Sequence, residues 1–378
     1  MQLRGSKQAV LAGGAVAAAL ALAACSSSSS SSSSSTAAAA GSSSAAASTS
    51  ASASAASSGS GTLNGAGSSF QNTYQLAAIA AFKSVNPGVT VNYQSVGSGT
   101  GRSDLYSNTV LFGGSDSPIP ASEDSKIPAG KKVLYFPVFI GPITMSYNLP
   151  GVSNLKLTPD VIAGIFSAQI TSWNDPKIAA INPGVKLPST AITIAVRSDS
   201  SGTNQNFTLY LQKAAPSIWK LGSGSTIKWP STAHAGAQNT GVASIIKSTV
   251  GAIGYVDYAD AKASGLSAAL VQNKAGQYVS PTPTGSSVDA AAATINPDLT
   301  FAAADASSAP TAYPISYQSW DLVYSTQPNA NDVAMLKSYI GYLLGAGQQL
   351  LPSLGYAPLP SNLVQKAEAQ LNTITVAS

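Results

Sequence analysis

Cysteine, histidine and charged side chains are scarce in this sequence, and each scarcity excludes a class of protein. Cys25 is the only cysteine among 378 residues, so no disulfide can form within the chain. His234 is the only histidine, and no cluster of His, Asp and Glu has the spacing of metal ligands, so we expect neither a metal nor a cofactor. Lys, Arg, Asp and Glu make up only 9% of the residues and form no basic stripe, which argues against a nucleic-acid partner.

Residues 1–24 have the pattern of a secretory signal. Arg4 and Lys7 precede an apolar run that ends at Ala24, and this run is shorter than the roughly 20 apolar residues of a membrane-spanning helix. Cys25 follows directly after Leu-Ala-Ala, an arrangement that resembles a bacterial lipobox. We therefore expect export, cleavage before Cys25, and a lipid on Cys25 that anchors the chain to the outer face of the cytoplasmic membrane.

The next segment, residues 25–61, consists after its cysteine almost wholly of Ser, Ala, Thr and Gly. Such a composition buries too little apolar surface to offset the entropy of ordering the backbone. We therefore expect a disordered tether here. Residues 62–378 have a globular composition, and they are too many for one small core, so two lobes are expected.

Strand-like and helical patterns alternate along the globular part. Gln71–Val85 has apolar residues near the helical period. The strand-like runs are Val89–Tyr93, Leu134–Ser146, Ala191–Val196 and Ala252–Val256. The long run with Pro137 and Pro142 is typical of a buried strand that crosses between lobes. The alternation predicts an α/β fold.

Three turns rich in glycine and hydroxyl side chains each stand between a strand-like run and an expected helix. They are Gly65–Phe70, Gly97–Gly101 and Arg197–Thr203. The start of a helix offers unpaired backbone N–H groups and the positive end of the dipole, so it attracts anions. A single turn of this kind usually only caps its helix. Three of them in one chain, with an arginine in the third, predict a site for a tetrahedral oxyanion.

Asp116 is unusual in such a setting, although an isolated aspartate would be read as a turn or cap residue. A carboxylate repels a fully ionised oxyanion, but it accepts a hydrogen bond from a protonated one. Phosphate keeps a proton at neutral pH and sulfate does not, so Asp116 would disfavour sulfate by roughly 10³–10⁵ in affinity. Arg197 would supply the opposing charge, and Asp199 would either hold its guanidinium group or cap a helix.

These stretches resemble the phosphate-binding proteins of phosphate-specific ABC importers, a branch of the periplasmic-binding-protein fold of type II. The similarity extends over residues 62–378. The shared motifs are Gly65-Ala66-Gly67, Ser69-Phe70, Val91-Asn92-Tyr93-Gln94, Gly97-Ser98, Phe112-Gly113, Ser115-Asp116, Trp173-Asn174-Asp175, Arg197-Ser198-Asp199, Ser201-Gly202-Thr203, Thr226-Ile227-Lys228-Trp229-Pro230, Gly251-Ala252-Ile253-Gly254-Tyr255 and Ala312-Tyr313-Pro314-Ile315. The chain departs from the family at Ser69, where threonine is usual, at Gln71, where proline is usual, and at Ser200, where glycine is common.

The resemblance implies a two-lobed α/β fold with a hinge and a ligand cleft between the lobes. Residues 62–142 and 313–378 would form lobe I, and residues 143–312 would form lobe II. Asp199 would support the site, and the phosphate contacts would be Ser69, Phe70, Ser98, Asp116, Arg197, Ser201, Gly202 and Thr203. The resemblance also implies a monomer that delivers inorganic phosphate to the membrane permease subunits of an ABC importer.

Two alternatives remain open from the residues. The same fold could bind another oxyanion, such as arsenate with its identical proton pattern, or a phosphate ester, or it could have a signalling role. A secreted serine hydrolase or phosphatase would have to use His234, yet no Gly-x-Ser-x-Gly elbow stands between a strand and a helix. We therefore expect a binding protein with no catalytic residue.

Overall fold

The computed structural model describes residues 59–377. The expected signal peptide, the lipidation site Cys25 and nearly all of the expected tether lie outside the described residues. The folded part begins with β1 at Gly61, one residue before the start expected from composition. Gly61 belongs to the fold because its N–H donates to the carbonyl of Gly88, beside the next strand.

The elements of the described part alternate as the sequence predicts. The strands are β1 (Gly61–Gly67), β2 (Val89–Ser95), β3 (Phe112–Ser115), β4 (Val133–Tyr147), β5 (Lys156–Leu157), β6 (Thr193–Arg197), β7 (His234–Gly236), β8 (Ala252–Asp257), β9 (Ser267–Ala268), β10 (Leu270–Gln272), β11 (Tyr278–Val279), β12 (Ser316–Tyr324), β13 (Thr326–Gln327) and β14 (Thr375–Val376). The helices are α1 (Asn72–Val85), α2 (Ser98–Tyr106), η1 (Ala121–Lys126), α3 (Pro159–Phe166), α4 (Pro176–Ile181), α5 (Gly202–Ala214), α6 (Gln238–Ser248), α7 (Tyr258–Ala263), α8 (Pro283–Ala290), α9 (Ala330–Leu344), η2 (Ala346–Leu350), α10 (Leu351–Leu354) and α11 (Ser361–Leu371).

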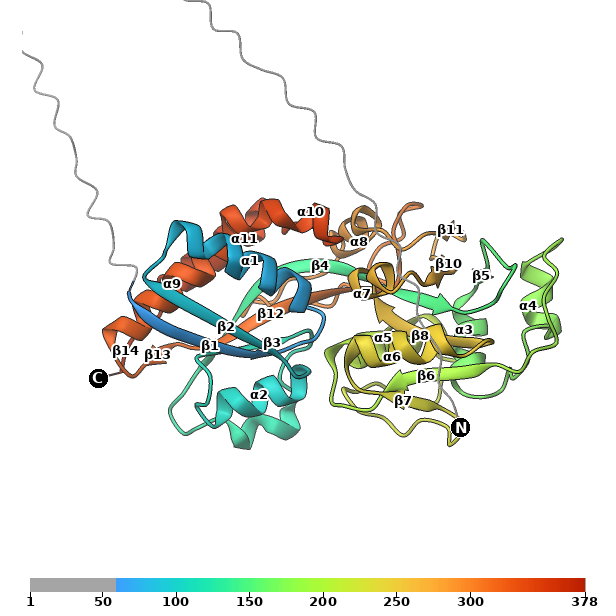
Figure 1. Cartoon of the computed structure of the whole chain (residues 1–378), viewed down its shortest axis with the longest axis horizontal. Helices are drawn as coiled ribbons and strands as arrows, with labels where there is room; N and C mark the ends of the chain where they lie inside the picture. Colours follow the sequence, from blue (N-terminus) through green and yellow to red (C-terminus); the bar gives the residue numbers. More distant parts are fainter. Residues whose placement is uncertain (1–58, 378) are drawn as a thin grey trace, which may run out of the picture. The chain divides into compact units, whose positions relative to one another are not determined.

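One large sheet connects the described residues, with the strand order β2-β1-β3-β12-β4-β8-β6-β7 and β9 paired to β4. Strands β1, β2 and β3 pair in parallel at one end, and β6, β7 and β8 pair in parallel at the other. The central strands β12 and β4 run antiparallel to their neighbours. Figure 1 shows β4 and β12 passing between the two ends. We call the end that contains β1, β2 and β3 lobe I, and the end that contains β6, β7 and β8 lobe II.

Strand β4 changes partner halfway along its length. Residues Val133–Pro142 pair with β12, whereas Ile143–Tyr147 pair with β8. This change of partner lies within residues 134–146, where the sequence predicts a strand that crosses between the lobes. The prediction of a long buried strand near residues 134–146 is confirmed, since β4 covers that range and is buried after its first residue. A second crossing strand, β12, is buried throughout.

The other expected elements are confirmed with small shifts at their ends. Helix α1 and strands β2 and β8 lie where the sequence predicts them. Strand β6 begins at Thr193, two residues later than expected, because Ala191 forms only a single bridge with Ser172.

The first glycine-rich turn is shorter than predicted, because Gly65–Gly67 continue strand β1. Gly65 and Gly67 pair with β2 on one side and with β3 on the other. A Cβ atom on Gly67 would lie 2.1 Å from the carbonyl oxygen of Gly114, so glycine is required for the close approach of β1 and β3. The connection to α1 is thus reduced to residues 68–71.

Buried aromatic side chains fix the start of α1 in lobe I and the packing of α5 against β8 in lobe II. In lobe I the Phe70 ring lies 3.7 Å from Tyr317 and 4.8 Å from Phe139 between ring centroids, which fixes the start of α1 against β4 and β12. In lobe II the rings of Phe207 on α5 and Tyr255 on β8 stack at 4.4 Å. Such buried aromatic pairs stabilise beyond the area they bury.

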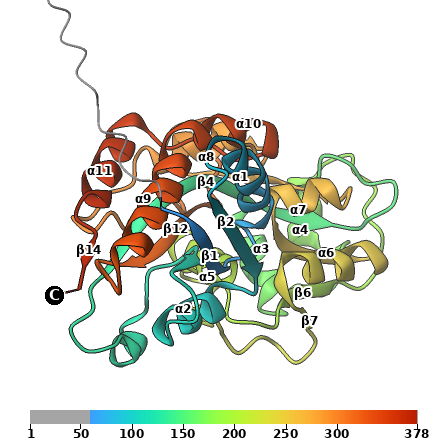
Figure 2. The ribbon, with the colours of Figure 1, turned by 60° about the vertical axis from the view of Figure 1, so that its left-hand side comes forward.

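Helices cover both faces of the sheet. Figures 1 and 2 show α1 and α2 on opposite sides of β1, and α9 and α11 beside one another near α1. Within residues 59–377 no helix is long and apolar enough to cross a membrane. In the same range no group of three or more His, Cys, Asp or Glu side chains could hold a metal ion.

Candidate anion-binding site

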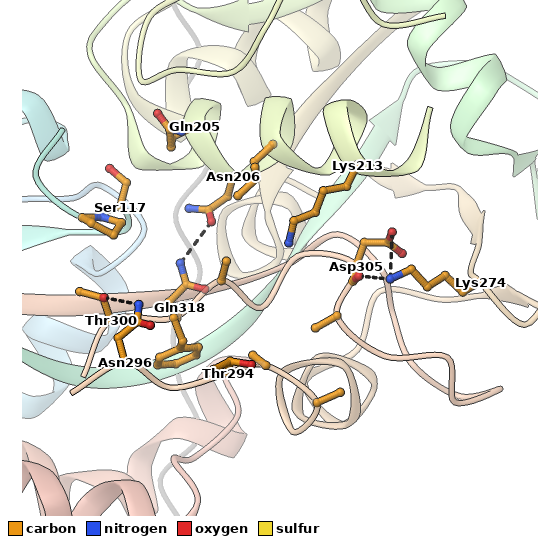
Figure 3. A pocket seen from close by; sticks show the side chains of 17 residues that line it. Ser117, Gln205, Asn206, Lys213, Lys274, Thr294, Asn296, Thr300, Asp305 and Gln318 are labelled. Carbon is orange, nitrogen blue, oxygen red and sulfur yellow. Dashed lines mark hydrogen bonds and ion pairs between the residues drawn. The ribbon is translucent and has the colours of Figure 1, made fainter. Parts of the chain in front are cut away.

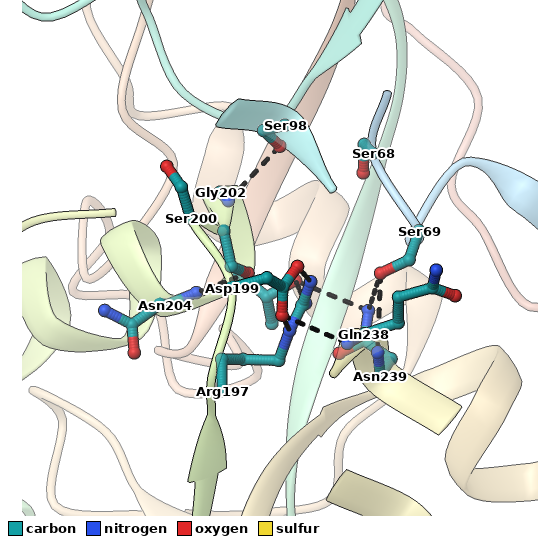
Figure 4. A network of polar contacts seen from close by, with 12 residues as sticks. Ser68, Ser69, Ser98, Arg197, Asp199, Ser200, Gly202, Asn204, Gln238 and Asn239 are labelled. Atoms are coloured by element: carbon teal, nitrogen blue, oxygen red, sulfur yellow. Dashed lines mark hydrogen bonds and ion pairs between the residues drawn. The ribbon is translucent and has the colours of Figure 1, made fainter. Parts of the chain in front are cut away.

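The N-terminal ends of four helices meet where the two lobes touch. Gly202 at the start of α5 donates its N–H to the Ser98 hydroxyl at the start of α2, at 3.2 Å. Asn239 in the first turn of α6 donates its N–H to the hydroxyl of Ser69, just before α1, at 3.4 Å. Figure 4 shows these contacts around the Arg197 side chain. Four sets of helix N–H groups therefore make this place favourable for an anion.

Arg197 supplies the positive charge from the end of β6. Its N–H donates to the Tyr255 hydroxyl at 2.9 Å, and its side chain is 1% exposed. The guanidinium group binds Asp199 in a fork, with Nε 2.8 Å from Oδ1 and Nη2 2.5 Å from Oδ2. Nη1 points to the Thr203 hydroxyl at 3.4 Å. The fork fixes the plane of the guanidinium group and directs Nη1 toward α5.

Asp199 combines the two roles that the sequence leaves open for it. Besides holding Arg197, its Oδ1 accepts the N–H of Gln238 at the start of α6, at 3.0 Å. Burial opposes its ionisation, but the hydrogen bonds and charge of Arg197 outweigh this effect and hold the pKa of Asp199 below its usual value. The Arg197–Asp199 pair is therefore an ion pair.

Asp116 lies directly after β3 and is 1% exposed. Its Oδ2 accepts hydrogen bonds from the hydroxyls of Ser68 at 2.6 Å and Ser98 at 3.4 Å. Its Oδ1 accepts one from Ser319 at 2.6 Å. Burial raises the pKa of Asp116 to about 6, against the lowering effect of these hydroxyls and of Arg197. Near neutral pH the group is thus predominantly a carboxylate that accepts hydrogen bonds.

The two consecutive serines before α1 have different tasks. The Ser69 hydroxyl, which the sequence singles out, faces lobe II and accepts hydrogen bonds from Asn239. The Ser68 hydroxyl binds Asp116 and accepts the N–H of Phe70 at 3.1 Å. The Phe70 amide, expected at the anion, is therefore engaged with Ser68.

The start of α5 brings together the other expected residues. The Ser201 hydroxyl caps the helix by accepting the N–H of Asn204 at 3.2 Å. The Thr203 hydroxyl lies between Arg197 and the side-chain amide of Asn239, 3.4 Å from a nitrogen of each. A Cβ on Gly202 would come within 2.5 Å of the Asp116 Cβ, so only glycine allows the lobes this approach.

The structure thus gathers the expected residues of both lobes, and it adds four that sequence reasoning missed. The four are Ser68, Ser319, Gln238 and Asn239. Asn239 is the second residue of α6, and the turn before this helix lacks the Gly-Ser signature of the other three. Ser319 lies inside a buried strand, where no local pattern marks it. His234 is exposed on β7.

A cavity of about 700 Å³ lies behind Asp116, between α5, β12 and residues 292–306 (Figure 3). At one end Asn206 and Gln318 donate to the Asp116 carbonyl, at 2.6 Å and 3.3 Å. At the other end lie Lys213, Lys274 and Asp305. The backbone of Asp116 is therefore held from lobe II and from the crossing strand β12 at once.

Comparison with known proteins gives a consistent result. A family model described as a PBP superfamily domain matches residues 39–346. The chain is 36% identical over 324 residues to the phosphate-binding protein PstS of Pasteurella multocida, covering 82% of this chain and 90% of that protein. It is 34% identical over 325 residues to the phosphate-binding protein PstS 3 of Mycobacterium leprae, covering 83% and 87%.

Solved structures agree on the fold. A high-affinity periplasmic phosphate-binding protein bound with phosphate superposes with a TM-score of 0.66 at 22% identity, covering 82% of this chain and 93% of that one. A phosphate-binding protein from Stenotrophomonas maltophilia superposes with a TM-score of 0.66 at 19% identity, covering 82% and 94%. At these identities the likeness establishes a shared two-lobed architecture.

Proposed function

The chain belongs to the family of PstS phosphate-binding proteins, and from this premise we propose that it binds inorganic phosphate between its lobes outside the cytoplasm and delivers it to an ABC importer. One observation of the site carries the choice of ligand. A buried carboxylate, Asp116, stands in an anion site beside a buried Arg197. Members of this family are binding proteins, not enzymes, so no residue is assigned a catalytic role.

In this proposal the donors around the site bind the phosphate oxygens. Arg197 contributes a guanidinium edge, Phe70 and Gly202 contribute backbone N–H groups, and the remaining donors are the hydroxyls of Ser69, Ser98, Ser201 and Thr203. The polar contacts that the Phe70 and Gly202 amides and Arg197 Nη1 make now are 3.1–3.4 Å long. Exchanging these long contacts for charge-assisted bonds to an anion is favourable.

Asp116 would select phosphate by its remaining acceptor capacity. A carboxylate offers about four lone-pair positions, and Ser68 and Ser319 occupy one on each oxygen at 2.6 Å. The Ser98 hydroxyl approaches Oδ2 at 3.4 Å, a contact that it would exchange for a phosphate oxygen. A free position remains on Oδ1, and burial keeps water from it. A phosphate O–H can donate there, whereas sulfate would place an acceptor against an acceptor.

Binding is proposed to hold the lobes closed. Residues 62–142 and 313–378 are the proposed lobe I, residues 143–312 are lobe II, and the partner exchange of β4 supports this division. Asp116 and Ser69 belong to the first group, and Arg197 and Thr203 to the second. A ligand that contacts both groups favours the closed arrangement by its differential affinity. We further propose that the closed monomer is what the permease subunits recognise.

The decisive test is calorimetric titration of the full chain with phosphate, with sulfate and arsenate as competitors. We expect phosphate to bind far more tightly than sulfate and arsenate to compete. Equal affinity for sulfate and phosphate would contradict the role of Asp116, and no affinity for phosphate would contradict the function.

Anchoring through Cys25 is a separate proposal, carried by the lipobox-like sequence before it. In a bacterial host we expect the chain to fractionate with membranes and to carry the mass of attached lipid. Cys25→Ser should abolish both properties without changing phosphate affinity. A Cys25→Ser chain that still fractionates with membranes would show a different mode of attachment.

A further inference from the structure

A buried chain of hydrogen bonds leads from the helices of lobe I to Asp116. Along it the Tyr339 hydroxyl donates to Gln75 Oε1 at 2.6 Å, Gln75 Nε2 to Gln71 Oε1 at 3.0 Å, Gln71 Nε2 to Ser319 Oγ at 2.8 Å, and Ser319 Oγ to Asp116 Oδ1 at 2.6 Å. Each of these five side chains is at most 1% exposed. Water therefore does not compete for any of these bonds.

Groups at the Tyr339 end determine which side chain donates and which accepts in each of these hydrogen bonds. Gln75 Nε2 lies 3.2 and 3.3 Å from the two carboxyl oxygens of Asp321, and its Oε1 accepts the Tyr339 hydroxyl, which together orient its amide. Gln71 is oriented in turn, because its Oε1 accepts from Gln75 and its Nε2 also donates to the Trp320 carbonyl at 2.9 Å.

The orientation of Gln71 decides where the Ser319 proton points. An amide NH₂ group can only donate, so the Ser319 oxygen accepts from Gln71 and its single proton is left for Asp116. Ser68 is polarised in the same way from the other side. Its oxygen accepts the Phe70 N–H, and its proton goes to Asp116 Oδ2. Both carboxylate oxygens thus receive protons from oriented hydroxyls. The other acceptor near Ser319, the Ser115 carbonyl, is 3.5 Å away, compared with 2.6 Å to Asp116.

Ser319 lies directly beside a β-bulge in the pairing of β12 with β4. Successive side chains of a regular strand point to opposite faces. Yet Gln318 donates to the Asp116 carbonyl and the next residue, Ser319, donates to the Asp116 carboxylate. Gln318 and Ser319 still pair in regular register with Ile140 and Phe139, and the register shifts only after Ser319, where Val138 of β4 is left unpaired.

We propose that Gln71 and Ser319 are positioning residues that make Asp116 a fixed hydrogen-bond acceptor and thereby set the preference of the site for a protonated oxyanion over sulfate. The inference rests on the proposed phosphate-binding function. Neither residue contacts the anion in this account. Both act through Asp116, and without them its carboxyl group protonates more readily, so that it can donate to sulfate.

The test compares two serines of β12, each fully buried, in the full chain. Ser319→Ala removes a donor to Asp116, whereas Ser316→Ala removes a hydroxyl bonded to the Tyr313 carbonyl and the Ser286 hydroxyl. Calorimetric titration gives the affinities for phosphate and sulfate. We expect Ser319→Ala to reduce the ratio of phosphate to sulfate affinity roughly tenfold, and Ser316→Ala to leave it within about twofold of wild type.

A pH series gives a second measurement that loss of stability alone does not move. The Ser319 bond lowers the pKa of Asp116, so its removal should shift the fall in phosphate affinity upward by up to about one pH unit. The other titratable groups that interact with Asp116 stay in place in both variants. They are Tyr93, Arg197, Asp257, Tyr317 and Tyr356.

Gln71→Met supplies the independent variant. It keeps the length of the side chain but cannot donate to Ser319. We therefore expect the ratio of phosphate to sulfate affinity to fall and the pH midpoint to rise, each by less than in Ser319→Ala. The variant also decides the question if Ser319→Ala does not fold. Selectivity and pH midpoint equal to those of Ser316→Ala would overturn the inference. A wild-type chain that does not bind phosphate would instead overturn the proposed function.

Discussion

The two lobes bring an aspartate each to the anion site, and the two carboxyl groups behave in opposite ways. In lobe II, burial opposes ionisation of Asp199, but Arg197 binds it in a fork and lowers its pKa. In lobe I, burial dominates and raises the pKa of Asp116 to about 6, because its partners are neutral hydroxyls. A guanidinium group compensates a buried carboxylate more strongly than hydroxyls do.

In the proposed site this difference would divide the work of binding between the lobes. Lobe II would supply a positive charge that attracts any oxyanion. Lobe I would supply an acceptor that tolerates an oxyanion only if the anion brings a proton. Affinity and selectivity are therefore separable, and substitutions on the two sides should have different signatures.

The largest effect is expected from the lobe II side, with Arg197→Ala. The change removes the charge and leaves the half-buried Asp199 without its cation, so affinity for phosphate should fall roughly 10³-fold or more. Calorimetry with phosphate and arsenate should show similar losses for both. Arg197→Lys keeps the charge but not the forked contact, so its phosphate affinity should lie between those of wild type and Arg197→Ala. A loss confined to one anion would show that Arg197 also selects.

Asp116→Asn should act mainly on selectivity. The amide can donate where the carboxylate only accepts, so the ratio of phosphate to sulfate affinity should fall at least roughly 100-fold. Competition titration at pH 7.5 measures the ratio. An unchanged ratio would remove Asp116 from the site and assign discrimination to the donors of lobe II.

Asn239→Ala probes the contact between the lobes. Its side chain links the Ser69 hydroxyl of lobe I to the Thr203 hydroxyl of lobe II, at 3.3 and 3.4 Å. Losing these bonds should weaken phosphate binding roughly tenfold and leave the selectivity ratio unchanged. Small-angle scattering with and without phosphate would check whether closure is impaired. A change of the ratio would instead assign Asn239 to ligand recognition.

The smallest expected effect is on the pH dependence of the Tm in the absence of phosphate. The folded pKa values of Asp116 and Asp321, about 6 and about 7, lie above the usual value. Their protonation therefore contributes stability that is fully present below the unfolded pKa of about 4 and is lost as pH rises through 6–7. We expect the Tm to fall by a few degrees between pH 5 and pH 8 in phosphate-free buffer.

Asp116→Asn and Asp321→Asn should each flatten this pH dependence. Asp199 has a lowered pKa, so its own contribution would be lost only in the acid range, below about pH 4. Asp289 of lobe II, whose pKa burial raises to about 7, contributes in the same direction, so the comparison of each variant with wild type carries the test. A pH dependence of the Tm that is the same in wild type and both variants would contradict the raised pKa values of Asp116 and Asp321.

Local patterns were sufficient for much of the fold and for part of the site. Helix α1 and strands β2, β4 and β8 follow from periodicity and flanking turns. Patterns were insufficient for β12, which was not identified as a second crossing strand, and for the exact end of β1. Whether Gly65–Gly67 extends a strand or forms a turn depends on β3, whose Phe112–Gly114 pair with these residues from a distance in the chain.

The sequence by itself determined the residue types of the proposed site: Asp116, Arg197 with Asp199, and hydroxyls and glycines before three helices. Only the tertiary structure decided which serine serves Asp116, that Asn239 joins the lobes, and that Gln71 orients Ser319. The partners of Asp116 come from positions 48 and 203 residues away. The opposite charge behaviour of the two aspartates arises from burial and from those partners, which are properties of the folded chain. The selectivity proposed for the site therefore depends on the tertiary structure, even though several of its residues stand in recognisable sequence motifs.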